Sequence, residues 1–399
     1  MGKIITDNEK IKKILERGVE DIFIKTDLEK KLKSGKELRV KLGFDPTGAK
    51  IHIGRAVILR KLKEFQDLGH KIIFIVGDFT ARIGDPSDKL NKRPMLSEEQ
   101  VKINLKNYKK QIGKIIDLSK AEFYFNSQWL KKLNFKEIAE LAESFSVQQM
   151  LARRNFKERF EKGEEISVRE FLYPLLQGYD SVIIKADVEI GGFDQLFNLK
   201  AGRIIQKHFK QEEQNILTGQ MLEGTDGRKM STSWENVINI TDEANEMFGK
   251  IMSLKDELIP KYFLLCTDIE EQEIEKIDKD IKSGKLNPRD AKLELALEIV
   301  RIYHGKNKAE EAKEEWVRVF SKKERPEETI KIKDSGKDKK IFDWLFANKL
   351  TESKSEGRRL IEQGGLKING KTVNNFEEKI RFKKGDLIKI GKKKFAEII

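Results

Sequence analysis

The spacing of apolar residues near the start of the chain predicts a strand, a helix and a second strand in succession. The run Leu38 to Leu42 is apolar enough for a strand, Ala56 to Leu68 has a helical pattern, and Lys71 to Val76 is an almost continuous apolar strand. Gly69 ends the helix between the two strands. Such a βαβ unit implies parallel strands with a right-handed crossover, in a sheet that is covered on both faces.

The rest of the chain is expected to be mostly helical, with few further strands. Ser167 and Glu170 have the spacing of a capping box, which predicts the start of a helix at that point. The expected elements are charged helices over residues 1–37 and 99–165, the helix after Ser167, a strand over Ser181 to Val188, a helix over 196–210, charged helices over 240–330, and a helix–helix–strand pattern from Ile341 to Ile399.

These patterns divide the chain into an α/β domain, an α-helical domain and a small α+β domain. A chain of 399 residues is long enough for about two or three domains with their own cores. The predicted boundaries are 1–238 for the α/β domain, with a helical insertion at about 120–165, 239–330 for the helical domain, 331–340 for a hydrophilic linker, and 341–399 for the small domain.

Charge is unevenly distributed, and this asymmetry points to a polyanionic partner. The chain has 80 Lys and Arg against 67 Asp and Glu, a formal net charge of +13. Residues 331–399 alone contain 19 Lys and Arg against 10 Asp and Glu, so this segment carries most of the excess. A basic module of this kind favours nucleic acid as the partner. A lysine-rich surface that only faces water is the alternative.

Composition also excludes several classes of site. Cys266 is the only cysteine, so the chain can form neither an intramolecular disulfide nor a multi-cysteine zinc site. The four histidines are scattered without the spacing of metal ligands. No early apolar run is typical of a signal peptide, and no segment approaches the roughly 20 apolar residues of a membrane span. We therefore expect a cytosolic protein.

The turn between the first predicted strand and its helix is a candidate anion site. It runs from Gly43 to Arg55 and is punctuated by glycine, so backbone N–H groups and the positive end of the helix can point at a phosphate. Thr47 and His52 add side-chain donors to the same turn. The sequence matches neither the G-x-G-x-x-G fingerprint nor the G-x-x-x-x-G-K-[ST] phosphate loop. An ordinary turn that happens to contain one histidine is the alternative.

A second candidate loop follows the next strand and leaves the sheet at the same edge. Ligands of open α/β sheets bind outside the carboxyl ends of the strands. Asp85 in this loop could bind a substrate ammonium, while Lys89 and Arg93 could bind phosphates. The Asp-Pro-Ser sequence at this place is also typical of a plain turn.

Three polar side chains lie on one face of the helix that the capping box starts. Tyr173, Gln177 and Asp180 are spaced i, i+4 and i+7, beside several apolar residues. A phenol, an amide and a carboxylate on one stripe can form the wall of a pocket that binds a small amino acid. Pro174 lies inside the same pattern and is expected to disturb the helix. A polar stripe that faces water is the alternative, most plausibly for Gln177.

Two later loops carry further candidate residues. Gly191 and Gly192 let a backbone approach a ligand closely, and Asp194 and Gln195 follow at once, where they could bind ribose hydroxyls and the substrate. The loop from Gly224 to Ser233 could bind phosphate, with charge from Lys229 and hydroxyl groups from Ser231, Thr232 and Ser233. Both loops could also be surface turns. In the basic C-terminal segment, binding of RNA by shape and charge is expected from Arg358, Arg359, Lys367 and Lys371.

Together these motifs resemble the bacterial-type tyrosyl-tRNA synthetases, which are class I aminoacyl-tRNA synthetases. Gly43-Phe44-Asp45-Pro46-Thr47 with His52-Ile53-Gly54 is similar to the first signature of the class, and Lys229-Met230-Ser231-Thr232-Ser233 is similar to the second. Gly84-Asp85-Pro86-Ser87, the Tyr173 stripe and Gly191-Gly192-Phe193-Asp194-Gln195 resemble the tyrosine pocket. The resemblance covers essentially the whole chain, and its end resembles an S-four-type RNA-binding domain.

The resemblance implies a fold, a reaction and partners. The fold would be a Rossmann-like parallel-sheet catalytic domain with a helical insertion, then an α-helical anticodon-binding domain and the RNA-binding domain. The reaction would join tyrosine to ATP as tyrosyl-adenylate, release pyrophosphate, and acylate tRNA(Tyr), with no covalent enzyme intermediate. Mg²⁺ is expected with ATP, no tightly bound cofactor is expected, and the family implies a homodimer with the insertion as its interface.

The resemblance also implies a role for each candidate residue. Residues implied in catalysis are Thr47, His52, Lys229, Lys89 and Arg93. Those implied in ATP binding are Gly43, Asp45, His52, Gly54, Arg55, Gly192, Asp194, Lys229, Met230, Ser231, Thr232 and Ser233. Tyrosine binding is implied for Lys41, Asp85, Tyr173, Gln177, Asp180 and Gln195, with Asp180 on the phenol hydroxyl.

Several positions depart from the pattern of the family. Arg55 stands where the first signature usually has a second histidine, and Thr232 where the second signature usually has a second lysine. Lys41 replaces a tyrosine that some members direct at the substrate phenol, and Glu235 replaces a glycine. Two alternatives therefore stand beside the tyrosine enzyme: a tryptophanyl enzyme, and a catalytically weak relative that acts as an RNA-binding protein.

Overall fold

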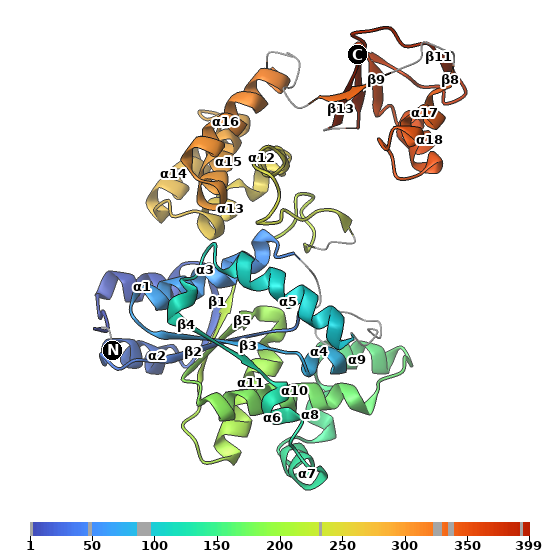
Figure 1. The fold of residues 1–399 in the computed structure, drawn as a ribbon. Helices are drawn as coiled ribbons and strands as arrows, with labels where there is room; N and C mark the ends of the chain where they lie inside the picture. Colours follow the sequence, from blue (N-terminus) through green and yellow to red (C-terminus); the bar gives the residue numbers. More distant parts are fainter. Residues whose placement is uncertain are drawn as a thin grey trace. The chain divides into compact units, whose positions relative to one another are not determined.

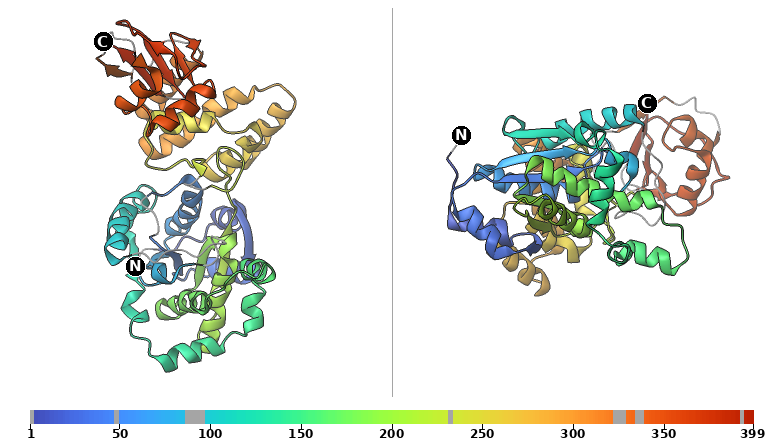
Figure 2. Two further views of the ribbon diagram at one scale, coloured as in Figure 1. Left: turned by 90° about the vertical axis from the view of Figure 1, so that its right-hand side faces the viewer. Right: turned by 90° about the horizontal axis from the view of Figure 1, so that it is seen from below.

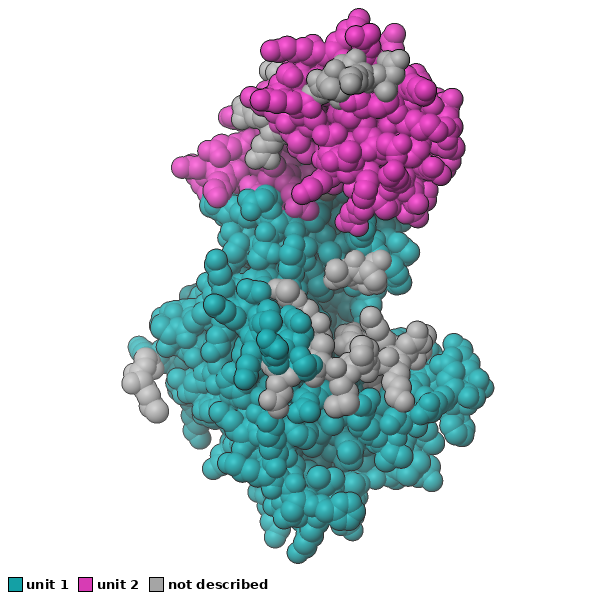
Figure 3. All heavy atoms as spheres, turned by 45° about the vertical axis from the view of Figure 1, so that its right-hand side comes forward, with its two compact units in different colours: residues 1–243, 250–305 teal, residues 244–249, 306–399 magenta. Residues whose placement is uncertain are grey.

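The computed structural model describes most of the chain as two compact units. The described residues are 3–46, 50–85, 97–230, 234–321, 329–333, 339–391 and 394–399. One unit comprises residues 1–243 with 250–305, and the other comprises 244–249 with 306–399; Figure 3 colours them separately. Each unit is described by itself below.

The first unit is built on a six-stranded sheet in which all but one strand run parallel. The strand order is β1-β6-β5-β2-β3-β4, and β1 pairs antiparallel with β6 at the edge. The strands are β1 (Val19–Phe23), β2 (Arg39–Phe44), β3 (Lys71–Val76), β4 (Ala121–Phe125), β5 (Val188–Gly192) and β6 (Asn215–Gly219). The sequence-based strands at 38–42 and 71–76 are confirmed as β2 and β3.

Helices cover both faces of this sheet, which explains the apolar strand at its centre. Helix α3 (Ile53–Asp67) lies on one face, and α10 (Val168–Ile184) with α11 (Leu196–His208) lies on the other (Figures 1 and 2). All residues of β3 after Lys71 are buried. The predicted βαβ unit is thus confirmed, as are the helix at 196–210 and the capping box of Ser167 and Glu170 at the start of α10.

Further helices complete the first unit, and one of them lies partly in the second unit. Those before α10 are α1 (Asn8–Glu16), α2 (Lys25–Lys33), α4 (Thr80–Ile83), α5 (Glu98–Ile112), α6 (Ser127–Leu130), α7 (Phe135–Glu143), α8 (Val147–Leu151) and α9 (Arg154–Glu161). Those after the sheet are α12 (Ala244–Met252), α13 (Ile259–Cys266), α14 (Glu271–Lys282) and α15 (Pro288–His304). No helix among the described residues is long and apolar enough to cross a membrane.

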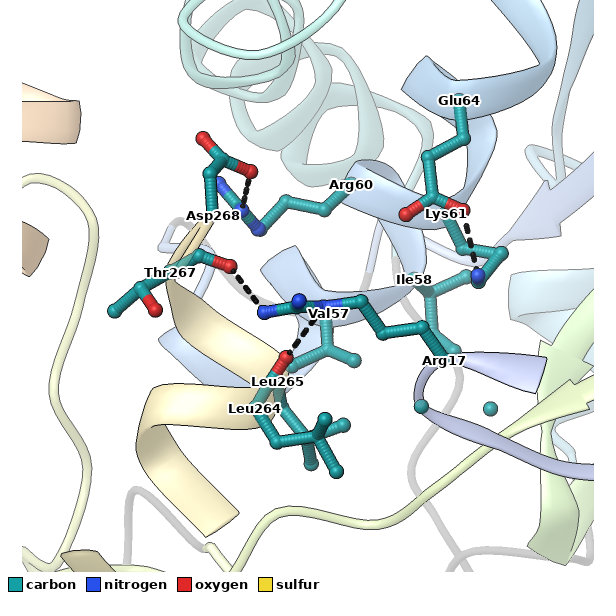
Figure 4. A pocket seen from close by; sticks show the side chains of 12 residues that line it. Arg17, Val57, Ile58, Arg60, Lys61, Glu64, Leu264, Leu265, Thr267 and Asp268 are labelled. Carbon is teal, nitrogen blue, oxygen red and sulfur yellow. Dashed lines mark hydrogen bonds and ion pairs between the residues drawn. The ribbon is translucent and has the colours of Figure 1, made fainter. Parts of the chain in front are cut away.

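Arginine at the end of α1 joins α13 to the α/β part of the first unit. The guanidinium of Arg17 donates to the carbonyl oxygens of Leu264, Thr267 and Ile269 at the end of α13, at 3.1, 2.9 and 2.7 Å. These carbonyls have no partner within the helix, so a cation there both satisfies them and opposes the helix dipole. Figure 4 shows the bonds to Leu264 and Thr267, in a small pocket that α3 also lines.

The C-terminal part of the second unit is a small α+β domain. Helices α17 (Ile341–Ala347) and α18 (Lys354–Glu362) pack on a five-stranded sheet of order β10-β9-β12-β13-β7, and their shared core includes Ile341, Leu345 and Ile388. The strands of this sheet are β7 (Ile330–Ile332), β9 (Leu366–Ile368), β10 (Lys371–Thr372), β12 (Leu387–Ile390) and β13 (Lys394–Ile398). Strands β8 (Lys339–Lys340) and β11 (Lys379–Ile380) form a separate two-stranded sheet, and α16 (Lys306–Trp316) precedes all of these strands.

Three secondary-structure predictions were wrong, each for a physical reason. Strand β1 lies within residues 1–37, where its charged residues and edge position disguised it as helix. Strand β4 lies within 99–165 and pairs with β3, so residues 121–125 belong to the sheet. Ser181 to Ile184 continue helix α10, with Ser181, Val182 and Ile184 buried and Ile183 exposed, as expected for a helix with one buried face. Only Val188 of that predicted strand lies in β5.

Candidate active site

The candidate residues of the first unit gather where the strand order reverses. Strand β2 lies between β3 and β5, which are reached by connections that run in opposite directions along the sheet. In open α/β sheets this point leaves a crevice at the carboxyl ends of the strands, where ligands bind. The segments that follow β2, β3 and β5 carry Asp45, Asp85 and Asp194 respectively. The fold therefore brings three of the sequence-predicted loops to one place.

Acidic groups line the interior of this crevice. Asp45 accepts hydrogen bonds from the hydroxyl of Thr80 at 2.8 Å and from the phenol of Tyr173 at 2.9 Å. Burial, together with the nearby carboxylates of Asp85 and Asp180, raises the pKa of Asp45 to about 7. Burial and the same acids hold the pKa of Tyr173 well above its ordinary value. A pocket with this surplus of negative charge is suited to an ammonium group.

Asp180 is the most enclosed of these acids, and its oxygens have fixed donors. The residue is 3% exposed. Its Oδ1 accepts from the indole Nε1 of Trp129 at 2.7 Å, and its Oδ2 accepts from Nδ2 of Asn126 at 3.2 Å. Burial raises the pKa of Asp180 to about 7. A carboxyl group that is oriented in this way can accept a hydrogen bond from a hydroxyl group at the end of a bound side chain.

Lys41 lies fully buried beside Asp180, in an ion pair with Glu189. Its Nζ is 2.9 Å from Oε1 of Glu189, and it also donates to the hydroxyl of Ser181 at 2.8 Å and to the carbonyl of Gln177 at 3.0 Å. Gln177 in turn donates through Nε2 to Glu189 at 3.1 Å. Lys41 and Gln177 thus share one buried carboxylate, and the charge of Lys41 opposes the rise in the pKa of Asp180.

The residues at the start of α3 and the loop that contains Lys229 lie side by side. The amide of Ile53 donates to the carbonyl of Ile238 at 2.7 Å, and His52 pairs with Asn239. A Cβ placed on Gly54 would be 3.1 Å from the sulfur of Met230. Glycine therefore allows close approach between the two loops, which are far apart in the sequence. This contact brings together the two motifs that the sequence predicts to bind one nucleotide.

Lys229 and Arg55, one from each of these two loops, both have polar partners on other segments. The Nζ of Lys229 is 3.1 Å from Oδ2 of Asp194, so the cation from one loop pairs with the carboxylate from another. Arg55 is exposed, and its Nη1 donates to the hydroxyl of Tyr108 at 2.6 Å. The ring of Tyr108 stacks on Phe44 at 5.2 Å between centroids. Through Tyr108, the side chain of Arg55 is thus held near Phe44, at the end of β2.

The remaining predicted site residues are either elsewhere or outside the described part of the chain. Gly43 lies within β2, Gly192 is the last residue of β5, and Gln195 follows β5 at the crevice. The predicted RNA-binding residues lie in the second unit and are exposed: Arg358, Arg359, Lys367 and Lys371. Arg358 also lies over the rings of Phe342 and Phe376, which gives it a packing role. Outside the described residues lie Thr47, Lys89, Arg93, Ser231, Thr232 and Ser233.

Sequence reasoning missed several residues of the site. Asn126 and Trp129 follow strand β4 directly and bond to Asp180. Recognition of the run from Ala121 to Phe125 as a strand would have placed both at the ligand-binding edge of the sheet. Thr80 and Glu189 carry no motif that marks them. Arg153, which no sequence motif marks, is 7% exposed and lies beside Asp85.

Comparison with known proteins matches both parts of the chain. Residues 33–321 match a family described as class I tRNA synthetases for tryptophan and tyrosine. Residues 320–398 match a family described as the C-terminal domain of tyrosine–tRNA ligases. The chain is 46% identical to tyrosine–tRNA ligase of Thermotoga maritima, over 99% of this chain and 98% of that protein. It is 47% identical to tyrosine–tRNA ligase 2 of Clostridium acetobutylicum, over 97% and 98%.

Solved structures share the same fold at lower identity. A C-terminally truncated mitochondrial tyrosyl-tRNA synthetase of Aspergillus nidulans aligns with a TM-score of 0.64 at 23% identity, covering 78% of this chain and 94% of that one. A tyrosyl-tRNA synthetase of Archaeoglobus fulgidus, solved with L-tyrosine, aligns with a TM-score of 0.62 at 22% identity, covering 76% and 99%.

Proposed function

The chain belongs to the class I tRNA synthetases for tryptophan and tyrosine, and we propose the part that each side chain of its site plays in forming tyrosyl-tRNA. It functions as a tyrosine–tRNA ligase, as do relatives 44–47% identical over nearly its whole length. The carboxylate of tyrosine attacks the α-phosphorus of ATP and pyrophosphate leaves. The terminal adenosine of tRNA(Tyr) then takes the tyrosyl group, and AMP is released.

The observation that carries specificity for tyrosine is the enclosed carboxyl group of Asp180. Trp129 and Asn126 fix its two oxygens, and Lys41 supplies a positive charge nearby. In our proposal the phenol hydroxyl of tyrosine donates to Asp180. A phenylalanine ring in the same place would leave this buried acceptor without its partner, which is costly. Lys41, held by Glu189, then acts on the phenol site through its charge.

The ammonium end of tyrosine is assigned to the acidic groups that line the crevice. We assign the α-ammonium to Asp85, Tyr173 and Gln177. The carboxyl groups of Asp45, Asp85 and Asp180 support this assignment, because several carboxylates close together in a buried site favour a bound cation. Gln195, which follows β5 at the crevice, is assigned to the amino acid. The reacting carboxylate would then lie toward the loops that bind ATP.

ATP is assigned to the paired loops. The hydroxyls of ribose would bind Gly192 and Asp194, and the phosphates would bind His52 with Arg55. Lys229 now pairs with Asp194 at 3.1 Å, so ATP would exchange that contact for its own ribose and phosphates. The wider ATP set that we propose includes Gly43, Asp45, Gly54, Met230, Thr47, Ser231, Thr232 and Ser233, with Lys89 and Arg93 on the departing pyrophosphate.

Catalysis at this site would depend on position and charge. Cations placed around the α-phosphorus stabilise the charge that develops as pyrophosphate leaves, and no covalent intermediate with the enzyme is needed. Mg²⁺ would enter as part of the nucleotide substrate. Among the described residues, no cluster of three or more His, Cys, Asp or Glu could hold a metal ion of its own.

Binding of tRNA(Tyr) is assigned to the later segments. We propose that 1–238 forms the catalytic domain, 239–330 the anticodon-binding domain, 331–340 a linker and 341–399 an RNA-binding domain. Exposed Arg359, Lys367 and Lys371 support the last assignment, because cations on one small domain attract phosphates. We place the reaction in the cytoplasm, where a bacterial-type ligase supplies protein synthesis.

We also propose that the protein acts as a homodimer through the insertion at about 120–165. Phe135 of α7, Val147 of α8 and Phe160 of α9 are each more than half exposed. Large apolar side chains gathered on one segment are typical of a surface that a partner covers. A second copy of the chain is the partner that the family implies.

Charging of tRNA tests the function directly. The purified protein, ATP and tRNA(Tyr) should form an ester of tyrosine with tRNA, and tryptophan should not replace tyrosine. Charging with tryptophan instead would favour the other branch of the family. Binding of tRNA without charging of either amino acid would favour a relative that only binds RNA.

A further inference from the structure

Arg153 places a buried cation beside the carboxylate that we assign to the substrate ammonium. It lies at the start of α9, is 7% exposed, and its Nη2 is 3.5 Å from Oδ1 of Asp85. Nδ2 of Asn198 donates to the same oxygen at 3.3 Å. A cation near an ammonium site is unexpected on charge alone, because like charges repel.

The guanidinium of Arg153 is held firmly in this position. It lies over the ring of Phe156 at 5.6 Å and over the ring of Phe197 at 5.3 Å, so aromatic faces from α9 and α11 flank it. Such cation–π contacts orient a guanidinium as well as stabilise it. The titratable groups that face it are the carboxylate of Asp85 first, then the phenol of Tyr173 and the carboxylate of Asp194.

A purely structural ion pair does not explain this arrangement. Buried polar groups that only stabilise a fold are almost always fully hydrogen-bonded. Here Nη1 of Arg153 and Oδ1 of Asn198 are both buried without a hydrogen-bond partner among the described residues. Two buried polar atoms without hydrogen bonds, both close to Asp85, reduce the stability of the free protein. Such unfavourable arrangements are concentrated at functional sites.

We propose that Arg153 is a positioning residue for tyrosine, which acts with Asn198 through Oδ1 of Asp85 to hold that carboxylate toward the α-ammonium of the substrate. The proposal rests on the role assigned to Asp85 above. Arginine keeps its charge at every physiological pH, so it balances the negative charge of Asp85, which also acts on Asp45. Arg153 itself does not touch the substrate in this account.

Ligands that lack one end of tyrosine make the proposal testable. The variants are Arg153→Met, which removes the charge, and Arg153→Lys, which keeps it. The control is Arg154→Met, because Arg154 is the next residue and is exposed. Each protein is titrated by calorimetry with tyrosine, with tyramine, which lacks the carboxylate, and with 3-(4-hydroxyphenyl)propionate, which lacks the ammonium.

Arg153→Met should weaken binding of tyrosine and of tyramine about tenfold or more, the effect of disturbing one charged hydrogen bond. Binding of the propionate should stay within about twofold of wild type, since it makes no contact with Asp85. Arg153→Lys should recover most of the loss, and Arg154→Met should match wild type. In pyrophosphate exchange, KM for tyrosine should rise more than kcat falls.

Three results would overturn the proposal. Equal weakening of all three ligands by Arg153→Met would mean that the pocket as a whole had collapsed. Loss confined to tyrosine and the propionate would mean that Arg153 contacts the carboxylate directly. Unchanged binding of tyrosine would mean that Arg153 has no role in it. Tyrosine-dependent exchange by the wild-type protein tests the proposed function separately, so failure of one can be told from failure of the other.

Discussion

Among single residues, Asp180 combines burial, fixed hydrogen bonds and a raised pKa at one carboxyl group. Its donors, Trp129 and Asn126, come from the segment after β4, and the cation that faces it, Lys41, comes from β2. Strand β2 and the segment after β4 thus both affect the protonation of Asp180.

Tyrosine should bind more weakly as pH falls below about 7. Burial raises the pKa of Asp180 from 3.8 to about 7, so at lower pH the free protein holds a proton that a carboxylate acceptor must lose. One such proton weakens binding by up to about tenfold per pH unit. Asp45, with its pKa also raised to about 7, can add a second proton.

Calorimetric titration with tyrosine from pH 5.5 to 8.5 measures this dependence. Asp180→Asn cannot take up the proton, so its slope against pH should be lower than that of wild type by one proton. An affinity for tyrosine that is flat across this range in the wild-type protein would contradict the assignment of Asp180 as a carboxylate acceptor.

Arg55 should contribute to adenylate formation through its bond to Tyr108. Tyr108→Phe removes the hydroxyl that accepts from Nη1 of Arg55, while the ring can still stack on Phe44. Loss of this bond should lower kcat/KM for ATP by about fivefold, the effect of about 1 kcal/mol. The affinity for tyrosine should not change, and this serves as the internal control.

Arg55→His is the companion variant, because histidine is usual at this position in the family. If the fixed charge of Arg55 serves the phosphates, this change should impair pyrophosphate exchange. Exchange that holds or rises in Arg55→His would mean that Arg55 has no part in catalysis.

At the residue scale, the sequence predicts what helical spacing determines and misses what only the fold brings together. Tyr173 and Asp180 both lie inside the pocket, because residues at i and i+7 share a face of any helix. Arg153 and Asp85 are 68 positions apart, and no local pattern marks their contact. The partner of Lys41 was likewise invisible, since Glu189 lies on a strand that pairs with β2 only in the fold.

At the scale of elements, the site depends on how β2, β5 and α10 pack together. Lys41 on β2, Glu189 on β5 and Ser181 on α10 form one buried network, in which the hydroxyl of Ser181 donates to Glu189 at 3.2 Å. Loss of the cation would leave a buried carboxylate without its charge partner, which is strongly destabilising.

Lys41→Met should therefore lower the free energy of unfolding by about 3–5 kcal/mol. Lys33→Met is the matched control, because Lys33 pairs with Glu29 on an exposed helix face and should change stability by less than about 0.5 kcal/mol. Urea denaturation of both variants gives the comparison. The double change Lys41→Met with Glu189→Met should recover part of the loss, and equal stability of Lys41→Met and wild type would contradict the account.

Element prediction from sequence was accurate where apolar periodicity was strong and failed for short or exposed strands. Strand β3 was placed correctly because its continuous apolar run fits only a buried strand. Strands β1 and β4 were missed because they lie at the two edges of the sheet, where half-exposed residues weaken the pattern. The residues after β4 that bind Asp180 were missed with it.

At the scale of the whole molecule, chemistry and charge are divided between different parts of the chain. Residues 33–321 match the synthetase family, and 320–398 match a domain of tyrosine–tRNA ligases. The sequence predicts this division from the concentration of basic residues after position 331. It could not assign Arg358 to packing over two aromatic rings, because those rings come from separate segments of the domain.

Substitution of Arg359, Lys367 and Lys371 by serine should weaken tRNA binding and leave pyrophosphate exchange with tyrosine unchanged. The slope of log affinity against log salt should fall by about 2–3, since each lost phosphate contact removes about 0.7–0.9. The control replaces the exposed Lys10, Lys30 and Lys36 by serine, which should leave the slope unchanged. Equal slopes in both variants would exclude this surface from tRNA binding.

Pyrophosphate exchange with tyrosine and with phenylalanine, in wild type and in Asp180→Ala, measures how much of the specificity for tyrosine depends on Asp180. Exchange by the wild-type protein should depend on tyrosine, with kcat/KM higher than for phenylalanine by orders of magnitude. In Asp180→Ala, kcat/KM for tyrosine should fall by orders of magnitude and the preference should nearly vanish. Exchange near the wild-type rate in Asp180→Ala, or a preference for tyrosine that survives the change, would contradict the account.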